Sequence, residues 1–507
     1  MAAMDERLWR VTALAAAALA LAFTGVNGPA AAEEKGTRPA EGPVLADVSG
    51  TWVAALSHLG ETQRFGLRFE PNDKNELIVK MTAPAVHVWD VPIGKATLEP
   101  GRVRIGSGFV LDYDHAAGTL SGTVPSALIP VHKIVAAFHR GTLDQTPRPE
   151  LDAPAARPAW TFDAGAPVWA DALFDGGTVY VGAEDGRLHA LEAKTGKERW
   201  SFRAGGPIRA RPTRWAADLF FQADDGYLYR VDAATGAERA RIRVNEKAIE
   251  RLPPSNEKSR FDRTASGATL ANGRLYVGTY DGHVLTLDPA EGSRLWDFAA
   301  GDTVLSTPVV DSGRVYFGSY DGNVYAVDAA SGALVWKHAT GAPVVSTPAL
   351  HEGRVIVGSR SYDLLALDGA TGAPAWTRYI WFSWVESPAT VRDGTAYLGS
   401  SDAAKVFAVD ARTGKSVWET DAHGWAWAQP AATDTRVFVG TTATPHYLVG
   451  HAAAFLAMDR ATGHVAWRFP AAAPTGDETY GFPGSPAVGD GLVFAGALDG
   501  RVYAFTQ

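Results

Sequence analysis

The second part of this chain repeats a unit of 40 residues or slightly more, and this repeat constrains the fold more than any other feature. In the clearest unit, residues 313–336, the turn glycine Gly332 lies four positions after Asp328 and four before Trp336. The same frame of acid, glycine and tryptophan ends at Trp200, Trp296, Trp376, Trp418 and Trp467, and Ala240 replaces the tryptophan in one further unit. Units of this length that contain four short apolar runs are typical of β-propeller blades.

The turns of the repeat have the chemistry that β-hairpins need. Asp-Gly pairs such as Asp321-Gly322 supply the positive φ angles of a two-residue turn. The acid of the frame can accept backbone N–H groups within the next turn, and the glycine relieves a left-handed position. The tryptophan falls on the outer strand, where its ring can fill the wedge between two blades. The repeat therefore predicts antiparallel blades that pack through tryptophan.

The number of blades follows from the two ends of the repeat region. After Trp467 the sequence supplies three more strands, near residues 485–488, 492–496 and 501–505, and a single strand, residues 159–162, precedes the first full unit. Joining this strand to the last three closes the ring and avoids unpaired edges. The sequence therefore predicts an all-β fold with an eight-bladed β-propeller over residues 159–507.

The region before the propeller has a different pattern. Residues 46–142 contain alternating runs such as 64–69 and 76–81, separated by glycines, which predicts a small antiparallel β domain with one wet face. Residues 143–158 contain Pro147, Pro149, Pro154 and Pro158. This segment is expected to be a Pro-rich linker.

The N-terminal segment predicts export. Arg7 and Arg10 precede an apolar run, residues 11–26, and Ala30, Ala31 and Ala32 are small enough for a signal peptidase. Residues 1–32 are therefore expected to be a signal peptide. The apolar run is shorter than the ~20 residues that span a bilayer, and no other stretch approaches that length, so we expect no membrane span after cleavage. The protein is expected to be periplasmic or secreted.

Composition excludes several classes of partner and chemistry. The net charge of −9 argues against nucleic acid, because phosphate binding needs clustered Lys and Arg. The chain has no cysteine, which excludes disulfides, thiolate metal sites, a cysteine nucleophile and lipidation at an N-terminal cysteine. We expect a monomer.

The unit from Val324 to Trp336, Val-Tyr-Ala-Val-Asp-Ala-Ala-Ser-Gly-Ala-Leu-Val-Trp, resembles the repeat of the pyrroloquinoline quinone (PQQ) dehydrogenase superfamily. The resemblance covers residues 160–507 and implies two different functions. One group of relatives comprises calcium- and PQQ-dependent alcohol and sugar dehydrogenases. The other comprises non-catalytic propellers, including the lipoprotein propeller of the outer-membrane β-barrel assembly machinery. The alcohol dehydrogenases stack the quinone beside a disulfide of adjacent cysteines, which this chain lacks, and their calcium ligands and catalytic Asp match no motif here.

One face of the predicted disc has the longer loops. From Ala240 to Gly273 the sequence has 33 residues, against 17 from Trp296 to Gly313, so the loop into blade three has 16 extra residues. The loop into blade eight and a hairpin of blade seven are also long, and function tends to lie where a scaffold elaborates its loops. The ligand-binding candidates on this face are Trp381, Trp384, Glu386, Trp425, Trp427, His446, Tyr447, Tyr480, Phe482 and Arg209. An aromatic rim with a few polar groups suits a sugar, a peptide or a planar ring.

Three other patterns on this face have a weaker basis. His446, His451 and His423 could bind a metal, but their spacing in the sequence does not by itself bring three ligands together. No metal site is therefore predicted. Glu386 and Asp171 could form an acid–base pair, but acids on inner strands more often line a wet channel, so no catalytic residue is predicted. Residues 245–263 contain charges of both signs, which predicts a solvated loop.

These observations favour binding over catalysis. We predict an exported, non-catalytic binding or scaffolding propeller that recognises a protein, a small molecule or a glycan on its loop-rich face and needs no cofactor. The alternative is a PQQ- and calcium-dependent alcohol or sugar dehydrogenase without the disulfide.

Overall fold

The computed structural model describes residues 45–144, except 107 and 127, and residues 151–507, except 254, 255, 257, 446 and 448. The predicted signal peptide, residues 1–32, lies outside the described residues. No helix in the described part of the chain is both long enough and apolar enough to cross a bilayer. The chain forms two compact units, which are described separately.

The N-terminal unit is a closed antiparallel barrel of eight strands. It comprises α2 (Leu45–Val48), β1 (Gly50–His58), β2 (Glu61–Pro71), β3 (Leu77–Ala83), the 3-10 turn η2 (Pro84–Val86), β4 (Val88–Glu99), β5 (Arg102–Ile105), β6 (Phe109–Asp114), β7 (Thr119–Thr123) and β8 (Val135–Arg140). β1 and β8 close it, with Trp52 opposite Arg140 and the guanidinium 4.5 Å from the centre of the indole ring. The expected small antiparallel β domain is thus a barrel with an apolar interior that includes Phe65 and Phe138.

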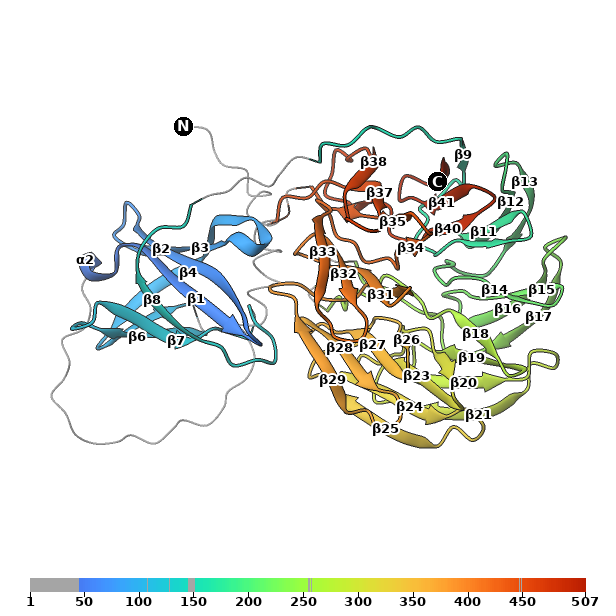
Figure 1. Ribbon diagram of the computed structural model, residues 1–507, viewed down its shortest axis with the longest axis horizontal. Helices are drawn as coiled ribbons and strands as arrows, with labels where there is room; N and C mark the ends of the chain where they lie inside the picture. The colour runs from blue at the N-terminus through green and yellow to red at the C-terminus, as the bar shows by residue number, and fades with distance from the viewer. Residues whose placement is uncertain are drawn as a thin grey trace. The chain divides into compact units, whose positions relative to one another are not determined.

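The C-terminal unit is an eight-bladed propeller, as predicted (Figure 1). Blades one to three comprise β10 (Leu173–Asp175), β11 (Thr178–Gly182), β12 (Arg187–Glu192), β13 (Glu198–Arg203); β14 (Thr213–Trp215), β15 (Asp218–Gln222), β16 (Tyr227–Asp232), β17 (Glu238–Arg243); and β18 (Ala268–Ala271), β19 (Arg274–Gly278), β20 (His283–Leu287), β21 (Arg294–Ala299). Blades four to six comprise β22 (Val309–Asp311), β23 (Arg314–Gly318), β24 (Asn323–Asp328), β25 (Leu334–Ala339); β26 (Ala349–His351), β27 (Arg354–Gly358), β28 (Asp363–Asp368), β29 (Pro374–Tyr379); and β30 (Thr390–Arg392), β31 (Thr395–Gly399), β32 (Lys405–Asp410), β33 (Ser416–Asp421).

Blade seven and blade eight complete the ring. Blade seven comprises β34 (Ala431–Ala432), β35 (Arg436–Gly440), β37 (Ala454–Asp459) and β38 (Val465–Pro470), and a short ladder joins β36 (Thr442–Ala443) to β39 (Tyr480–Gly481). Blade eight comprises β40 (Ala487–Gly489), β41 (Leu492–Gly496), β42 (Arg501–Thr506) and β9 (Trp160–Asp163). β9 pairs antiparallel with β42, with Ala504 opposite Trp160. The predicted closure, by one strand from before the first blade, is confirmed.

The repeated tryptophan and glycine form the contact between successive blades. Trp336 donates from Nε1 to the carbonyl of Gly369 in the next blade at 3.0 Å. Its ring lies directly over Gly372, where a Cβ would come within 2.7 Å of the indole and where φ is +74°. Asp328 accepts the backbone N–H of Ser331 at 2.8 Å, which fixes the turn before the outer strand. Where Ala240 replaces the tryptophan, the side chain of Ile242 covers the equivalent Gly292.

Candidate functional site

The loops on the elaborated face surround the mouth of the central channel. A cavity of about 70 Å³ lies in this channel. Most blades contribute residues that come just before their first strand. Several blades contribute two such residues, as blade one does with Trp169 and Asp171, and Glu386 comes from blade six. Such a volume holds about five waters.

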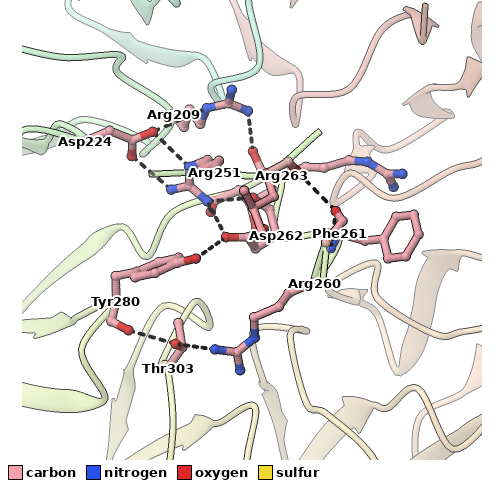
Figure 2. Close-up of polar contacts among 12 residues, drawn as sticks. Arg209, Asp224, Arg251, Arg260, Phe261, Asp262, Arg263, Tyr280 and Thr303 are labelled. Atoms are coloured by element: carbon pink, nitrogen blue, oxygen red, sulfur yellow. Dashed lines mark hydrogen bonds and ion pairs between the residues drawn. The ribbon is translucent and has the colours of Figure 1, made fainter. Parts of the chain in front are cut away.

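A segment of the chain itself covers this cavity. The long loop between β17 and β18 extends over the channel mouth, and we call its described residues, 245–253, 256 and 258–266, the strap. Phe261, Arg263 and Thr264 of the strap line the cavity together with residues of distant blades. Figure 2 shows the polar contacts that hold the strap in place.

Arg251 anchors the first half of the strap to blade two. Its guanidinium forms two parallel hydrogen bonds with the Asp224 carboxylate, at 2.8 and 2.9 Å, and donates to the carbonyls of Asp262 and Thr264 at 2.6 and 3.0 Å (Figure 2). Both partners of the pair are more than nine-tenths buried. Burial lowers the pKa of Arg251, but the hydrogen bonds and charge of Asp224 outweigh it and raise the pKa overall. The guanidinium is therefore a permanent cation in a buried site.

Two neighbouring groups extend this anchor. Arg209 pairs with Glu184 of blade one, lies 3.5 Å from the Asp224 carboxylate, and donates to the backbone carbonyl of Arg263 at 3.0 Å. Tyr280 of blade three donates to the Asp262 carboxylate at 2.6 Å. Burial and this hydrogen bond raise the pKa of Tyr280, so its hydroxyl remains a donor at neutral pH.

A second anchor holds the far end of the strap on blades four to six. Arg360 donates to the carbonyl of Arg260 at 2.8 Å and pairs with Glu386 at 2.5 Å. Tyr320 donates to the same Arg260 carbonyl at 3.0 Å, and burial raises the pKa of its phenol to about 12. The guanidinium of Arg260 meets the Asp302 carboxylate at 2.7 Å. The strap is therefore fixed on both sides of the channel.

Aromatic side chains pack between the two anchors. Arg263 lies over the Trp427 ring at 3.9 Å from its centre, and Trp427 in turn stacks on Trp425 at 4.8 Å. Phe261 meets Trp384 edge to face at 5.9 Å. The backbone of Phe261 has a φ of +54°, a strained value for a large side chain, and such strain persists only where the surroundings impose it.

The structure corrects the interpretation of residues 245–263 as a solvated loop. Several charges of opposite sign meet partners over the channel instead of facing solvent. Arg251 and Asp262 are buried side chains, and only part of the strap, including Lys247 and Lys258, is exposed. The physical reason is that each buried charge has a partner supplied by a different blade, which a linear pattern does not reveal.

The sequence candidates separate into two groups. Arg209, Trp384, Glu386 and Trp427 lie together around the strap. Trp425, which is buried, belongs with them, because it stacks on Trp427 and its ring centre lies 5.9 Å from the Arg263 guanidinium. The buried members of the second group are Trp381, which packs on Tyr379, and Phe482, which packs on Phe455. Tyr447 and Tyr480 are half-buried, and His446 lies outside the described residues.

The sequence did not propose as site residues the charged residues of the strap or the groups that hold it. The strap residues are Arg251, Arg260 and Asp262, and the groups around them are Glu184, Asp224, Tyr280, Asp302, Tyr320 and Arg360. The one available signal was the 16-residue excess of the loop into blade three. Within the described residues, no three His, Asp or Glu side chains gather as metal ligands would.

Comparisons with known proteins agree on the fold. The profile of the family described as outer membrane protein assembly factor BamB matches residues 150–246, 224–381 and 380–507. No curated protein sequence matches the chain.

Three solved structures are similar to the propeller. The computationally designed protein Ika8 has a TM-score of 0.54 at 17% identity and covers 71% of this chain and 99% of its own. BamB from Moraxella catarrhalis has a TM-score of 0.53 at 18% identity, and the match covers 70% of this chain and 98% of that protein. A quinohemoprotein alcohol dehydrogenase from Comamonas testosteroni has a TM-score of 0.52 at 15% identity, and the match covers 69% of this chain and 76% of that protein. At these identities the similarity establishes the fold and nothing more.

Proposed function

This chain belongs to the PQQ-like propeller family of the outer membrane protein assembly factor BamB, and on that premise we propose that its propeller is a non-catalytic platform that binds a protein in the cell envelope. The observation that carries the proposal is the strap. A propeller that works through its channel needs an open mouth, whereas here the chain's own residues cover the mouth and pair with the surrounding charges. The surface left for a partner is the outside of the strap and the loops around it.

The residues of the channel do not fit a quinone cofactor. A three-ring quinone needs a slot far larger than the space of about five waters that lies under the strap. A quinone with several carboxylates also needs cations, and the two most buried arginines near the channel, Arg251 and Arg360, already pair with Asp224 and Glu386. Removing either partner from such a buried pair is costly, which disfavours their transfer to a cofactor. PQQ and calcium therefore have no part in the proposed function.

The outer side of the strap has the composition of a protein-binding rim. Lys247 and Lys258 are exposed, and Trp384, Trp427 and Tyr480 are half-buried at the loops into blades six, seven and eight. Half-buried aromatics with an exposed polar rim are common where proteins associate. The elaborated face is therefore the proposed docking face.

Site-specific photo-crosslinking in the native envelope tests this proposal. A photoreactive amino acid replaces Lys258 on the strap in one variant and Ala330, an exposed turn residue on the opposite face, in the other. We expect one discrete protein adduct from position 258, identified by mass spectrometry as an outer-membrane assembly protein, and none from position 330. Equal adducts from both positions, or none from 258, would show that the face or the role is wrong.

A further inference from the structure

The cavity under the strap has a chemistry of its own. Its apolar wall is formed by side chains such as Leu305, Val345 and Pro388. In several blades a polar residue follows the apolar one two positions later, as Thr307 follows Leu305. These polar residues form the second wall, which includes Asp171 and Gln429. A concave space with one apolar and one polar side is the usual form of a small-molecule site.

The polar wall is organised by hydrogen bonds between successive blades. Thr307 accepts the N–H of Gly267 on Oγ1 at 2.8 Å, and Thr347 accepts the N–H of Thr307 at 2.9 Å. Ser485 likewise accepts the N–H of Gln429 at 3.0 Å. A hydroxyl that accepts a backbone bond still carries its own hydrogen and a further lone pair. These side chains are thus fixed in position while keeping capacity for a ligand.

Asp171 continues this ring with a charge. One oxygen, Oδ1, accepts the N–H of Ser485 at 2.6 Å. In the described part of the chain Asp171 forms no ion pair, whereas Glu386, the other acid of the cavity, is held by Arg360. The second oxygen of Asp171 is therefore a charged acceptor with no cation within ion-pair distance in the described residues. Arg263, which also lines the cavity, lies over the Trp427 ring.

We propose that this cavity binds the primary ammonium group of a small hydroxyl-bearing amine. An ammonium has three N–H donors, which suit Asp171, the amide oxygen of Gln429 and the hydroxyl of Ser485, a residue that hydrogen bonds link to both of the others. Space for about five waters limits the ligand to a molecule of about as many non-hydrogen atoms. A metal ion is a poorer occupant, because the described residues bring no third acid or histidine to the site. Trp427 lines this cavity and also lies on the proposed docking face, but the two proposals have different readouts, ethanolamine binding and crosslinking, so either can fail without the other.

Titration calorimetry on the full chain tests the site with ethanolamine as the probe and ethylene glycol as its neutral match in size. We expect saturable binding of ethanolamine and at least tenfold weaker binding of ethylene glycol, because a hydrogen bond to a charged group contributes about 1.5–3 kcal/mol. Asp171→Asn keeps the oxygen that accepts the Ser485 N–H and removes the charge. It is expected to weaken ethanolamine binding by about 10- to 100-fold.

The matched control is Glu352→Gln, an exposed acid in a turn away from the cavity. It removes the same charge and is expected to leave binding unchanged. Circular dichroism and the unfolding midpoint of each variant establish that the fold is intact. Equal affinity for the two probes, equal affinity of Asp171→Asn and the unaltered chain, or no binding of ethanolamine would each overturn the proposal. Tighter binding of tetramethylammonium than of ethanolamine would overturn the assignment to a primary ammonium.

Discussion

Replacement of Arg251 by methionine removes the first anchor of the strap while keeping an apolar stem of similar length. Breaking a buried ion pair costs about 3–5 kcal/mol, because the remaining charge is left without compensation. Here Arg209 stays 3.5 Å from the Asp224 carboxylate, so we expect the lower end, about 3 kcal/mol. The strap is a loop joined to a complete ring, so the loss should appear as opening of the strap and not as unfolding of the propeller.

Hydrogen exchange of backbone amides measures that opening directly. The reporter is the amide of Ile249, which donates to the Asp224 carbonyl at 2.6 Å, and the amides of β23 in blade four serve as the internal control. A loss of about 3 kcal/mol corresponds to a fall in protection of roughly 100-fold. Adding Asp224→Asn removes the uncompensated charge and should restore part of the protection. A change below threefold in the single variant, or an equal loss across β23, would refute the anchor.

Two further predictions concern the repeat itself. Gly353→Ala places a Cβ in open space at a φ of +74° and should lower the free energy of unfolding by about 1 kcal/mol. In Gly372→Ala the φ is the same, but the new Cβ would lie 2.7 Å from the ring of Trp336. Urea unfolding should therefore show a free energy of unfolding that is lower by a further amount of about 1–3 kcal/mol. Equal losses in the two variants would refute the packing role of the tryptophan. The pKa of Asp232 is lowered to about 2, chiefly by the hydroxyl of Thr235 and then by Arg239. A carboxylate with a depressed pKa stabilises the fold at pH values above its ordinary pKa near 4, and this stabilisation is lost as the pH falls towards 2. The free energy of unfolding, measured in urea, should therefore fall less steeply between about pH 4 and pH 2 in Asp232→Asn than in the unaltered chain. Identical slopes would contradict the assignment.

The ring of blades was predictable because its signals are local. The four-residue spacing between Gly332 and Trp336 recurs in the other blades that carry this glycine and tryptophan. Counting strands showed that the last blade lacks one, which the lone strand before the first blade supplies. The site was harder to predict because its bonds join residues far apart in the chain, such as Arg260 and Arg360. Pattern alone could not distinguish a solvated charged loop from one whose charges meet partners on other blades. For the same reason Trp381 and Trp384, close in sequence, differ in burial.

The claim that the strap closes the channel to a cofactor is tested most directly by adding that cofactor. The purified chain is equilibrated with PQQ and calcium, desalted, and its absorbance is recorded beside that of a variant in which a short glycine linker replaces residues 247–262. We expect no quinone absorbance in the unaltered chain, because the strap and the paired arginines leave no slot for three fused rings. Stoichiometric retention of the quinone by the unaltered chain would contradict the account and favour a dehydrogenase.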